Sequence, residues 1–213
     1  MTERVLFGFW APLLLLAGPA LHTQAGLDRV QQSLSQGRFV EAAKELQKIV
    51  LQSGPSLKRP DPAEEKVLHR AIDSTRRFLN ENHPPAERNA ARQVLCLSRA
   101  YFAEDQPGLE ENALRVGGTT QRPELIGEPV RRYPPEARKA GIQGTVIVEV
   151  IVDPEGCVRH PRVLKGVPSL DGAGLAAVRS WTFQPATRDG KVVAVYYVLS
   201  VSFSLKDSRD RDG

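Results

Sequence analysis

Residues 144–152, GTVIVEVIV, and residues 191–205, KVVAVYYVLSVSFSL, decide the fold of the C-terminal part of this chain. Both stretches are rich in β-branched or aromatic residues, so each predicts a β-strand, and the first is too short to cross a membrane. Asp153-Pro154-Glu155-Gly156 follows the first stretch and has the residues of a tight turn. Residues 157–164 are therefore expected to return as the second strand of a hairpin.

A helix is predicted between this hairpin and the last strand, over residues 169–183, SLDGAGLAAVRSWTF. Ser169 is the expected N-cap, and Gln184-Pro185 the expected end. The face that recurs at helical spacing, and should pack on the sheet, consists of Leu170, Gly174, Ala177, Val178 and Trp181. The order strand, strand, helix, strand predicts an α+β unit, a three-stranded antiparallel sheet with helices on one face.

The order of the strands follows from Pro161 and from the handedness of the crossover. Pro161 cannot donate a ladder hydrogen bond, which confines the second strand to an edge. A right-handed crossover then makes residues 144–152 central and residues 191–205 the other edge. Because the last strand has fifteen residues against nine in its neighbour, part of it is expected to have an unpaired side.

Three motifs follow one another in this region. They read Tyr133-Pro134-x-x-Ala137-Arg138-x-x-x-Ile142-x-Gly144-x-Val146, then Asp153-Pro154-x-Gly156-x-Val158, then Ala177-Val178-Arg179-x-Trp181-x-Phe183-x-Pro185-Ala186. Together they resemble the C-terminal domain of TonB energy transducers. The resemblance covers about residues 123–205. It implies a transport protein of the periplasm whose partner is the extended N-terminal box of an outer-membrane transporter.

The last strand is the expected partner-binding element, because a peptide added to its edge gains main-chain hydrogen bonds (β-augmentation). The predicted binding residues there are Val193, Ala194, Val195, Tyr196, Tyr197 and Val198. Alternation predicts one face toward the helix, formed by Val193, Val195, Tyr197, Leu199, Val201 and Phe203. The opposite face is then formed by Ala194, Tyr196, Val198, Ser200 and Ser202.

The resemblance adds a second segment to the predicted site, formed by Val130, Arg131, Arg132, Tyr133 and Pro134. A structural alternative stays open for this segment. In that alternative Tyr133 only packs in the core, and Pro134 starts a short helix over residues 134–140.

Residues 1–25 have the features of a targeting segment. Arg4 precedes an apolar run over residues 5–21, and Thr23-Gln24-Ala25 is an acceptable cleavage pattern. A cleaved secretory signal is favoured over an uncleaved inner-membrane anchor, because two prolines interrupt a run that is at the lower limit for a span. Either alternative places the rest of the chain in the periplasm.

Residues 26–115 predict a helical domain that forms its own core. Residues 37–50 resemble one helix of a tetratricopeptide-like pair, with a plain helical hairpin as the alternative. Asp61 is the expected cap of a helix that starts at Pro62, and residues 86–103 predict another helix. Residues 116–122 form the expected linker, residues 123–205 the TonB C-terminal-like domain and residues 206–213 a disordered tail. The long Pro-rich linker usual in TonB transducers is missing from the sequence.

No motif in the sequence predicts catalysis, a cofactor or a metal site. The four histidines lie far apart, and no Gly-x-Ser-x-Gly, phosphate-loop or dinucleotide pattern occurs. The net charge of +4 with dispersed basic residues does not indicate nucleic-acid binding. Cys96 and Cys157 are the two cysteines, and the sequence leaves open whether they form a disulfide or stay free.

Two functional hypotheses follow. In the first, a TonB-like periplasmic protein binds an extended transporter peptide along its last strand and supports energy-coupled transport. In the second, a periplasmic adaptor uses the β domain for homodimerisation and the helical domain to recruit a partner, without energy transduction. Whether an inner-membrane proton-channel complex drives the protein is left open.

Overall fold

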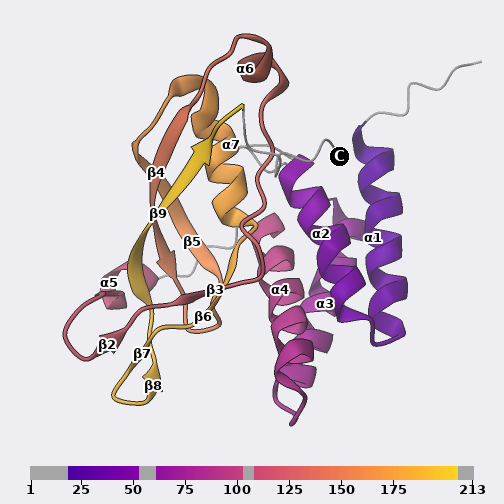
Figure 1. Ribbon diagram of the computed structural model, residues 1–213. Coiled ribbons are helices and arrows are strands. Elements are labelled where there is room, and N and C mark those ends of the chain that lie inside the picture. The colour runs from indigo at the N-terminus through magenta and orange to yellow at the C-terminus, as the bar shows by residue number, and fades with distance from the viewer. Residues whose placement is uncertain (1–18, 53–60, 103–107, 206–213) are drawn as a thin grey trace, which may run out of the picture.

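The computed structural model describes residues 19–52, 61–102 and 108–205 (Figure 1). A helical bundle lies on one side and a sheet with its own covering helix on the other. The body of the predicted targeting segment, residues 1–18, and the predicted tail, residues 206–213, fall outside these ranges. Within them, no helix combines the length and the apolar character needed to span a bilayer.

Four helices form the bundle: α1 (Pro19–Ser35), α2 (Phe39–Gln52), α3 (Pro62–Leu79) and α4 (Pro85–Phe102). Each helix packs against two others, α1 against α2 and α3, and α4 against the same two. The bundle has a core of its own, which includes Leu27, Val30, Ala42, Leu46, Val50, Leu68, Ala71, Ala91, Val94 and Leu97. The predicted helical region is thus confirmed as two packed helical hairpins.

The start of α3 is fixed by a capping box. The Asp61 carboxylate accepts hydrogen bonds from the backbone N–H groups of Ala63 and Glu64, each at 2.9 Å. The Glu64 carboxylate in turn accepts from the Asp61 N–H at 2.9 Å. Such caps contribute about 1 kcal/mol, and the predicted cap at Asp61 with Pro62 at the first helical position is confirmed.

The main sheet has the strand order β1-β9-β4-β5. The strands are β1 (Leu114–Arg115), β4 (Gly144–Val152), β5 (Val158–Lys165) and β9 (Val195–Phe203). The long strands β9, β4 and β5 form the predicted antiparallel arrangement with β4 in the centre, and Pro161 lies in an edge strand. The two-residue β1, which lies in the part of the sequence expected to be helical, joins the sheet in parallel with β9.

Helix α7 (Pro168–Arg179) covers one face of this sheet (Figure 1). The core between them includes Val146, Val148, Val150, Leu170, Ala177, Val178, Trp181, Val195, Leu199, Val201 and Phe203. Gly174 lets the helix approach β4 closely, because a Cβ at this position would lie 2.9 Å from a methyl group of Val146. Packing therefore explains a residue that costs the helix about 1 kcal/mol in propensity.

Short elements complete the C-terminal part. They are α5 (Leu109–Asn112), α6 (Pro135–Lys139), β2 (Thr120–Gln121), β3 (Glu124–Ile126), β6 (Thr182–Gln184), β7 (Thr187–Arg188) and β8 (Lys191–Val192). Strand β3 pairs with β6, and β7 pairs with both β2 and β8. These pairs tie the segment after the bundle to the segment after α7.

The predicted strand over residues 191–205 is wrong in extent. Asp189 and Gly190 both have positive φ, and the turn they make pairs Lys191 and Val192 with β7 instead of with the main sheet. Strand β9 therefore begins only at Val195, and all nine of its residues pair with β4. No unpaired overhang arises from a difference in length.

The predicted helix over residues 169–183 is wrong at both ends. It begins at Pro168, with Val167 as a cap that uses no side chain, because proline is pre-organised for the first helical position. It ends at Arg179, because residues 182–184 extend and pair with β3. The local pattern identified the buried face but could not show this distant pairing.

The β4–β5 turn is the point at which the sheet meets the bundle. Cys96 of α4 and Cys157 form a disulfide, with their Cα atoms 4.9 Å apart, which resolves the alternative left open by the sequence. The buried Asp153 carboxylate accepts from the backbone N–H groups of Glu155 and Cys157, each at 2.9 Å, and from Arg159 Nε at 3.1 Å. The predicted turn is thus also an anchor.

Arginines of the bundle surround this turn. Arg99 of α4 is buried and forms ion pairs with Asp153, at 3.6 Å, and with Glu155. Arg92 of α4 donates to the Glu155 carbonyl oxygen at 2.8 Å. Burial is the main cause that lowers the pKa of Arg92, with the neighbouring Arg88 adding to it. The bundle and the sheet are therefore joined by a covalent bond and by buried charge.

Candidate functional site

The outer edge of β9 is the candidate site. Toward the sheet, β9 is paired with β4 along its whole length. On its other side, β1 pairs only with Val195 and Tyr196. In the described parts of the chain, no strand pairs with this side of β9 beyond Tyr196. Residues 197–203 thus have a free edge next to a fully formed ladder.

The backbone groups that point to this edge can be identified from one hydrogen bond. The Leu114 N–H donates to the Ala194 carbonyl oxygen at 2.9 Å, so the backbone of Ala194 faces the side of β1. Backbone groups of alternate residues face the same edge of a strand. The N–H and C=O groups of Val198, Ser200 and Ser202 are therefore available to an added strand.

The side chains of β9 alternate as expected between the core and the outer face. Val195, Leu199, Val201 and Phe203 are buried, whereas Val198, Ser200 and Ser202 are exposed. Val198 is an exposed apolar side chain, with a relative exposure of 50%. Tyr196 and Tyr197 are half-buried. An added strand would thus meet an apolar contact at Val198 and hydroxyl groups beyond it.

Val193 and Ala194, two predicted binding residues, lie before β9 rather than on it. The Val193 N–H donates to the Ala186 carbonyl oxygen at 3.0 Å, which bends the chain out of the strand. Ala194 is buried, although alternation had placed it on the outer face. The expected alternation is wrong at Ala194, because it was extended through a break between β8 and β9.

A group of charged and aromatic side chains lies where β1 covers β9. Glu149 of β4 is 5% exposed and accepts from Arg115 at 2.7 Å and from Arg162 Nε at 2.9 Å and Nη2 at 2.5 Å. These hydrogen bonds, Arg115 first, hold the pKa of Glu149 below its usual range. The guanidinium of Arg115 also lies 4.4 Å from the centre of the Tyr196 ring, within cation–π range.

The predicted segment Val130–Pro134 is held by the core of the same domain. The Val130 carbonyl oxygen accepts from Trp181 Nε1 at 3.0 Å. Tyr133 is buried, and its hydroxyl donates to the Ile142 carbonyl oxygen at 2.5 Å. Its ring makes an edge contact with Phe203, with centroids 5.5 Å apart. Tyr133 therefore supports the C-terminal end of β9 from within.

The other residues of this segment lie nearer the surface. Arg132 is exposed, Arg131 and Pro134 are half-buried, and Pro134 directly precedes α6. The packing of Tyr133 and the short helix are the features of the structural alternative. A contact of the exposed Arg132 with a partner stays a prediction.

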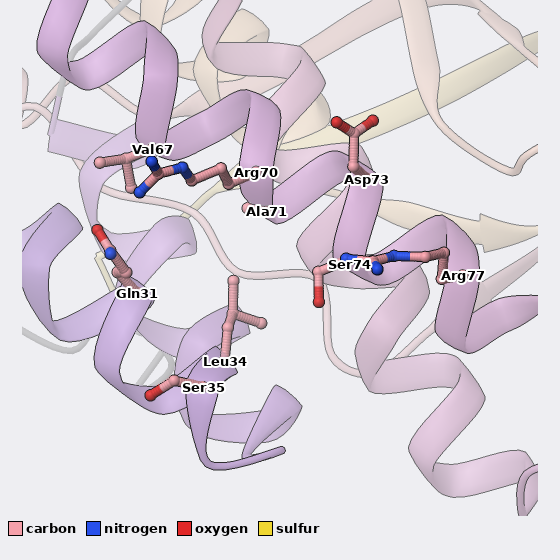
Figure 2. A pocket seen from close by; sticks show the side chains of 9 residues that line it. All are labelled: Gln31, Leu34, Ser35, Val67, Arg70, Ala71, Asp73, Ser74 and Arg77. Carbon is pink, nitrogen blue, oxygen red and sulfur yellow. The ribbon is translucent and has the colours of Figure 1, made fainter.

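A separate pocket of about 330 Å³ lies between α1 and α3, and Figure 2 shows the side chains that line it. Its lining residues are Gln31, Leu34, Ser35, Val67, Arg70, Ala71, Asp73, Ser74 and Arg77. Leu34, Val67 and Ala71 give it an apolar part, and the arginines and Asp73 a charged part. No histidine or cysteine lines it, and no potential metal-binding group of three or more residues occurs among the described residues.

Sequence reasoning missed the groups that surround Glu149 and Asp153. The even number of cysteines was the one signal for the contact at the β4–β5 turn. Glu149, Arg115 and Arg162 are far apart in the sequence and carry no motif, so only the pairing of strands brings them together.

Comparison with known proteins identifies the type of the C-terminal domain. Residues 129–205, little more than a third of the chain, match the family model described as Gram-negative bacterial TonB protein C-terminal. Protein TonB of Vibrio cholerae is 35% identical over 98 residues, which are 42% of this chain and 40% of that protein. Protein TonB of Xanthomonas campestris is 40% identical over 76 residues, 35% of this chain and 34% of that protein.

A further relative has a similar overlap. Protein tonB2 of Pseudomonas aeruginosa is 34% identical over 82 residues, 38% of this chain and 30% of that protein. The chain thus spans less than half the length of these relatives. The expected resemblance to the TonB C-terminal family is confirmed for this domain.

Proposed function

We propose that this chain is a TonB-like periplasmic protein that binds an extended peptide of an outer-membrane transporter along β9. The observation that carries the proposal is the free edge at residues 197–203, in a domain of the TonB C-terminal family. The chain acts by binding rather than by catalysis, and it supports energy-coupled transport.

The sheet supplies a rigid template for an added strand. Strand β9 is paired residue for residue with β4, and its inner side chains are buried against α7. An incoming peptide therefore needs to order only itself, which lowers the entropic cost of binding. Tyr133 and Phe203 hold the end of the strand in the same way.

Backbone hydrogen bonds alone give weak binding. Each one contributes about 0.5–1.5 kcal/mol net, whereas association costs at least about 4 kcal/mol in lost freedom of motion. Side-chain contacts must add to the free energy of binding. The exposed Val198 and the exposed hydroxyls beyond it are the contacts that the edge offers.

In this proposal the N-terminal segment sets the location of the protein. A cleaved signal gives a periplasmic protein, and an uncleaved anchor gives one attached to the inner membrane and driven by a proton-channel complex. N-terminal sequencing of the mature protein after membrane fractionation distinguishes the two.

The edge mechanism is tested with Val198→Pro. The proline removes one N–H that faces the edge and leaves the ladder to β4 intact, as is tolerated in edge strands. We expect a synthetic transporter-box peptide to lose at least about tenfold in affinity by titration calorimetry, because a donor is lost and the ring obstructs the edge.

Val198→Ala is the matched control. It keeps the backbone N–H and removes only the apolar contact, so its loss of affinity measures that contact alone and should be smaller than the loss in the proline variant, which loses both. Equal affinity of the Val198→Pro variant and the unmodified chain would contradict edge-strand binding.

The same free edge favours a second candidate, a homodimeric adaptor. Two copies of β9 could pair along residues 197–203 and leave the bundle to recruit a partner. Analytical ultracentrifugation of the mature chain separates the candidates. A dimer that persists at high salt and does not bind the box peptide supports the adaptor hypothesis. A monomer that binds the peptide supports the first proposal.

A further inference from the structure

Strand β1 occupies the beginning of the proposed partner edge. It runs parallel to β9, with Leu114 opposite Val195 and Arg115 opposite Tyr196. The Leu114 side chain is half-buried against the sheet core. The chain thus already contains one short added strand, and its contacts show how this edge receives a strand.

Glu149 and Tyr196 form the receiving side of this contact. Arg162 of β5 holds the Glu149 carboxylate through Oε2, which leaves Oε1 to accept from Arg115. The hydroxyl of Tyr196 donates to the Glu110 carbonyl oxygen at 3.0 Å, which orients the ring. The carboxylate is thus supported from β5, independently of β1, whereas the ring is oriented by α5, the short helix just before β1.

Arg115 is held much less firmly than the groups that receive it. Its side chain is 69% exposed, whereas that of Glu149 is 7% exposed. Strand β1 has only two residues, and the chain leaves the edge at Gly117 and Gly118, of which Gly118 has a φ of 60°. A half-exposed ion pair with a short strand is a contact that a longer strand can replace.

We propose that Glu149 and the Tyr196 ring form a subsite for a basic side chain of the partner peptide, which Arg115 occupies in the free protein. The inference rests on the proposed function, because it specifies how a peptide binds the same edge. The partner then runs parallel to β9, places Lys or Arg where Arg115 lies, and continues opposite residues 197–203.

Charge explains why the subsite selects a basic residue. A neutral side chain would leave Glu149 Oε1 without its charged donor, and an acidic one would meet a buried carboxylate. Arg162 does not remove this preference, because it already pairs with the other carboxylate oxygen. Hydrogen bonds between charged groups are about twice as strong as neutral ones.

The test uses a peptide of the chain itself as the probe. Residues 109–118, LEENALRVGG, are synthesised with Arg, Ala or Glu at the position of Arg115. Their affinities are measured for the full-length protein and for its Arg115→Ala variant, by fluorescence anisotropy. Arg122→Ala, an exposed arginine in the same connection, is the matched control.

The Arg115→Ala protein should bind the Arg peptide about tenfold more tightly than the unmodified protein, because an internal competitor is removed. The Ala peptide should bind this variant about tenfold more weakly than the Arg peptide, and the Glu peptide more weakly still. Glu149→Gln combined with Arg115→Ala should abolish the discrimination.

Leu114→Pro gives a second route to the same result. It removes the N–H that bonds the Ala194 carbonyl oxygen, so it should free the edge even if Arg115→Ala folds poorly. Equal affinity for the Arg and Ala peptides in the freed protein overturns the subsite.

The two proposals fail in different ways. Suppose that Val198→Pro weakens binding of a transporter-box peptide, while the Arg115→Ala protein binds the Arg and Ala peptides equally well. The subsite is then wrong and the proposed function stands. Suppose instead that the Arg115→Ala protein prefers the Arg peptide to the Ala peptide, while Val198→Pro leaves the affinity for the box peptide unchanged. The edge mechanism is then wrong and the cation subsite stands.

Discussion

The β4–β5 turn and the outer edge of β9 belong to one sheet, but their polar groups are satisfied in opposite ways. At the turn, the buried Asp153 carboxylate is paired with Arg99 of the bundle and Arg159 of the sheet, and a disulfide closes the contact. Along β9, the backbone donors and acceptors of Val198, Ser200 and Ser202 face outward. We infer that the β4–β5 turn holds the sheet in place, while the outer edge of β9 is open to an added strand.

Asp153→Asn at the β4–β5 turn is expected to have the largest effect on stability. The substitution keeps an oxygen for the backbone N–H groups but removes the charge that faces Arg159 and Arg99. We expect the free energy of unfolding to fall by about 3–5 kcal/mol, since removing one charge of a buried ion pair is strongly destabilising. Urea denaturation measures the change, and a loss below about 1 kcal/mol would show that the charges are solvated rather than buried.

Loss of the disulfide is expected to cost somewhat less. Cys96 and Cys157 are 61 positions apart. Without the cross-link the unfolded chain gains conformational entropy, which should lower the free energy of unfolding by about 2–4 kcal/mol. The double variant Cys96→Ala/Cys157→Ala should unfold at lower urea concentration. Its peptide affinity at β9 should persist under native conditions. A double variant that is as stable as the unmodified protein would show that the arginine contacts suffice alone.

Val198→Pro should have a small effect on stability, although it removes peptide binding. Its N–H faces the free edge, so no ladder hydrogen bond is lost, and the expected cost is below about 1 kcal/mol. Tyr197→Pro, one position away, removes a ladder hydrogen bond to β4 and should cost about 1–3 kcal/mol, because a carbonyl oxygen of β4 loses its donor. Thermal denaturation of the pair therefore tests which side of β9 is open.

The smallest expected effect is the pH dependence due to Glu149. Hydrogen bonds from Arg115 and Arg162 lower its pKa in the folded protein. The pKa of a glutamate in the unfolded chain is about 4.3. Near that pH the folded state therefore binds fewer protons than the unfolded state. The stabilisation is then complete above that pH and is lost as the pH falls through the lower folded value. The stability difference between the protein and Glu149→Gln should shrink under acid, and a constant difference contradicts the assignment.

The sequence predicted features that depend on neighbouring residues. The strand at residues 144–152, the turn at Asp153-Pro154, the cap at Asp61 and the inward positions of β9 all follow from local pattern. The position of Pro161 even determined the strand order, because a missing donor excludes a central strand.

Features that depend on distant residues were missed. The break between β8 and β9 arises because the Val193 N–H donates to the Ala186 carbonyl oxygen and Lys191 pairs with β7. The periodicity of apolar residues does not predict either contact. The burial of Arg99 contradicts the usual preference of arginine for solvent, and its ion pairs with the two carboxylates of the turn help to compensate for it. Strand β1 has two residues, too few to produce a pattern.

The disulfide between α4 and the β4–β5 turn limits how the chain can be dissected for experiments. A fragment confined to the family-matching residues 129–205 would lack both Cys96 and Arg99, exposing the thiol of Cys157 and the turn carboxylates. A fragment of the bundle alone would lack Asp153 and Glu155, the two carboxylates that form ion pairs with Arg99. Truncated versions of either half are therefore unsuitable stand-ins, and mixed disulfides between fragment molecules are the artefact to expect from them.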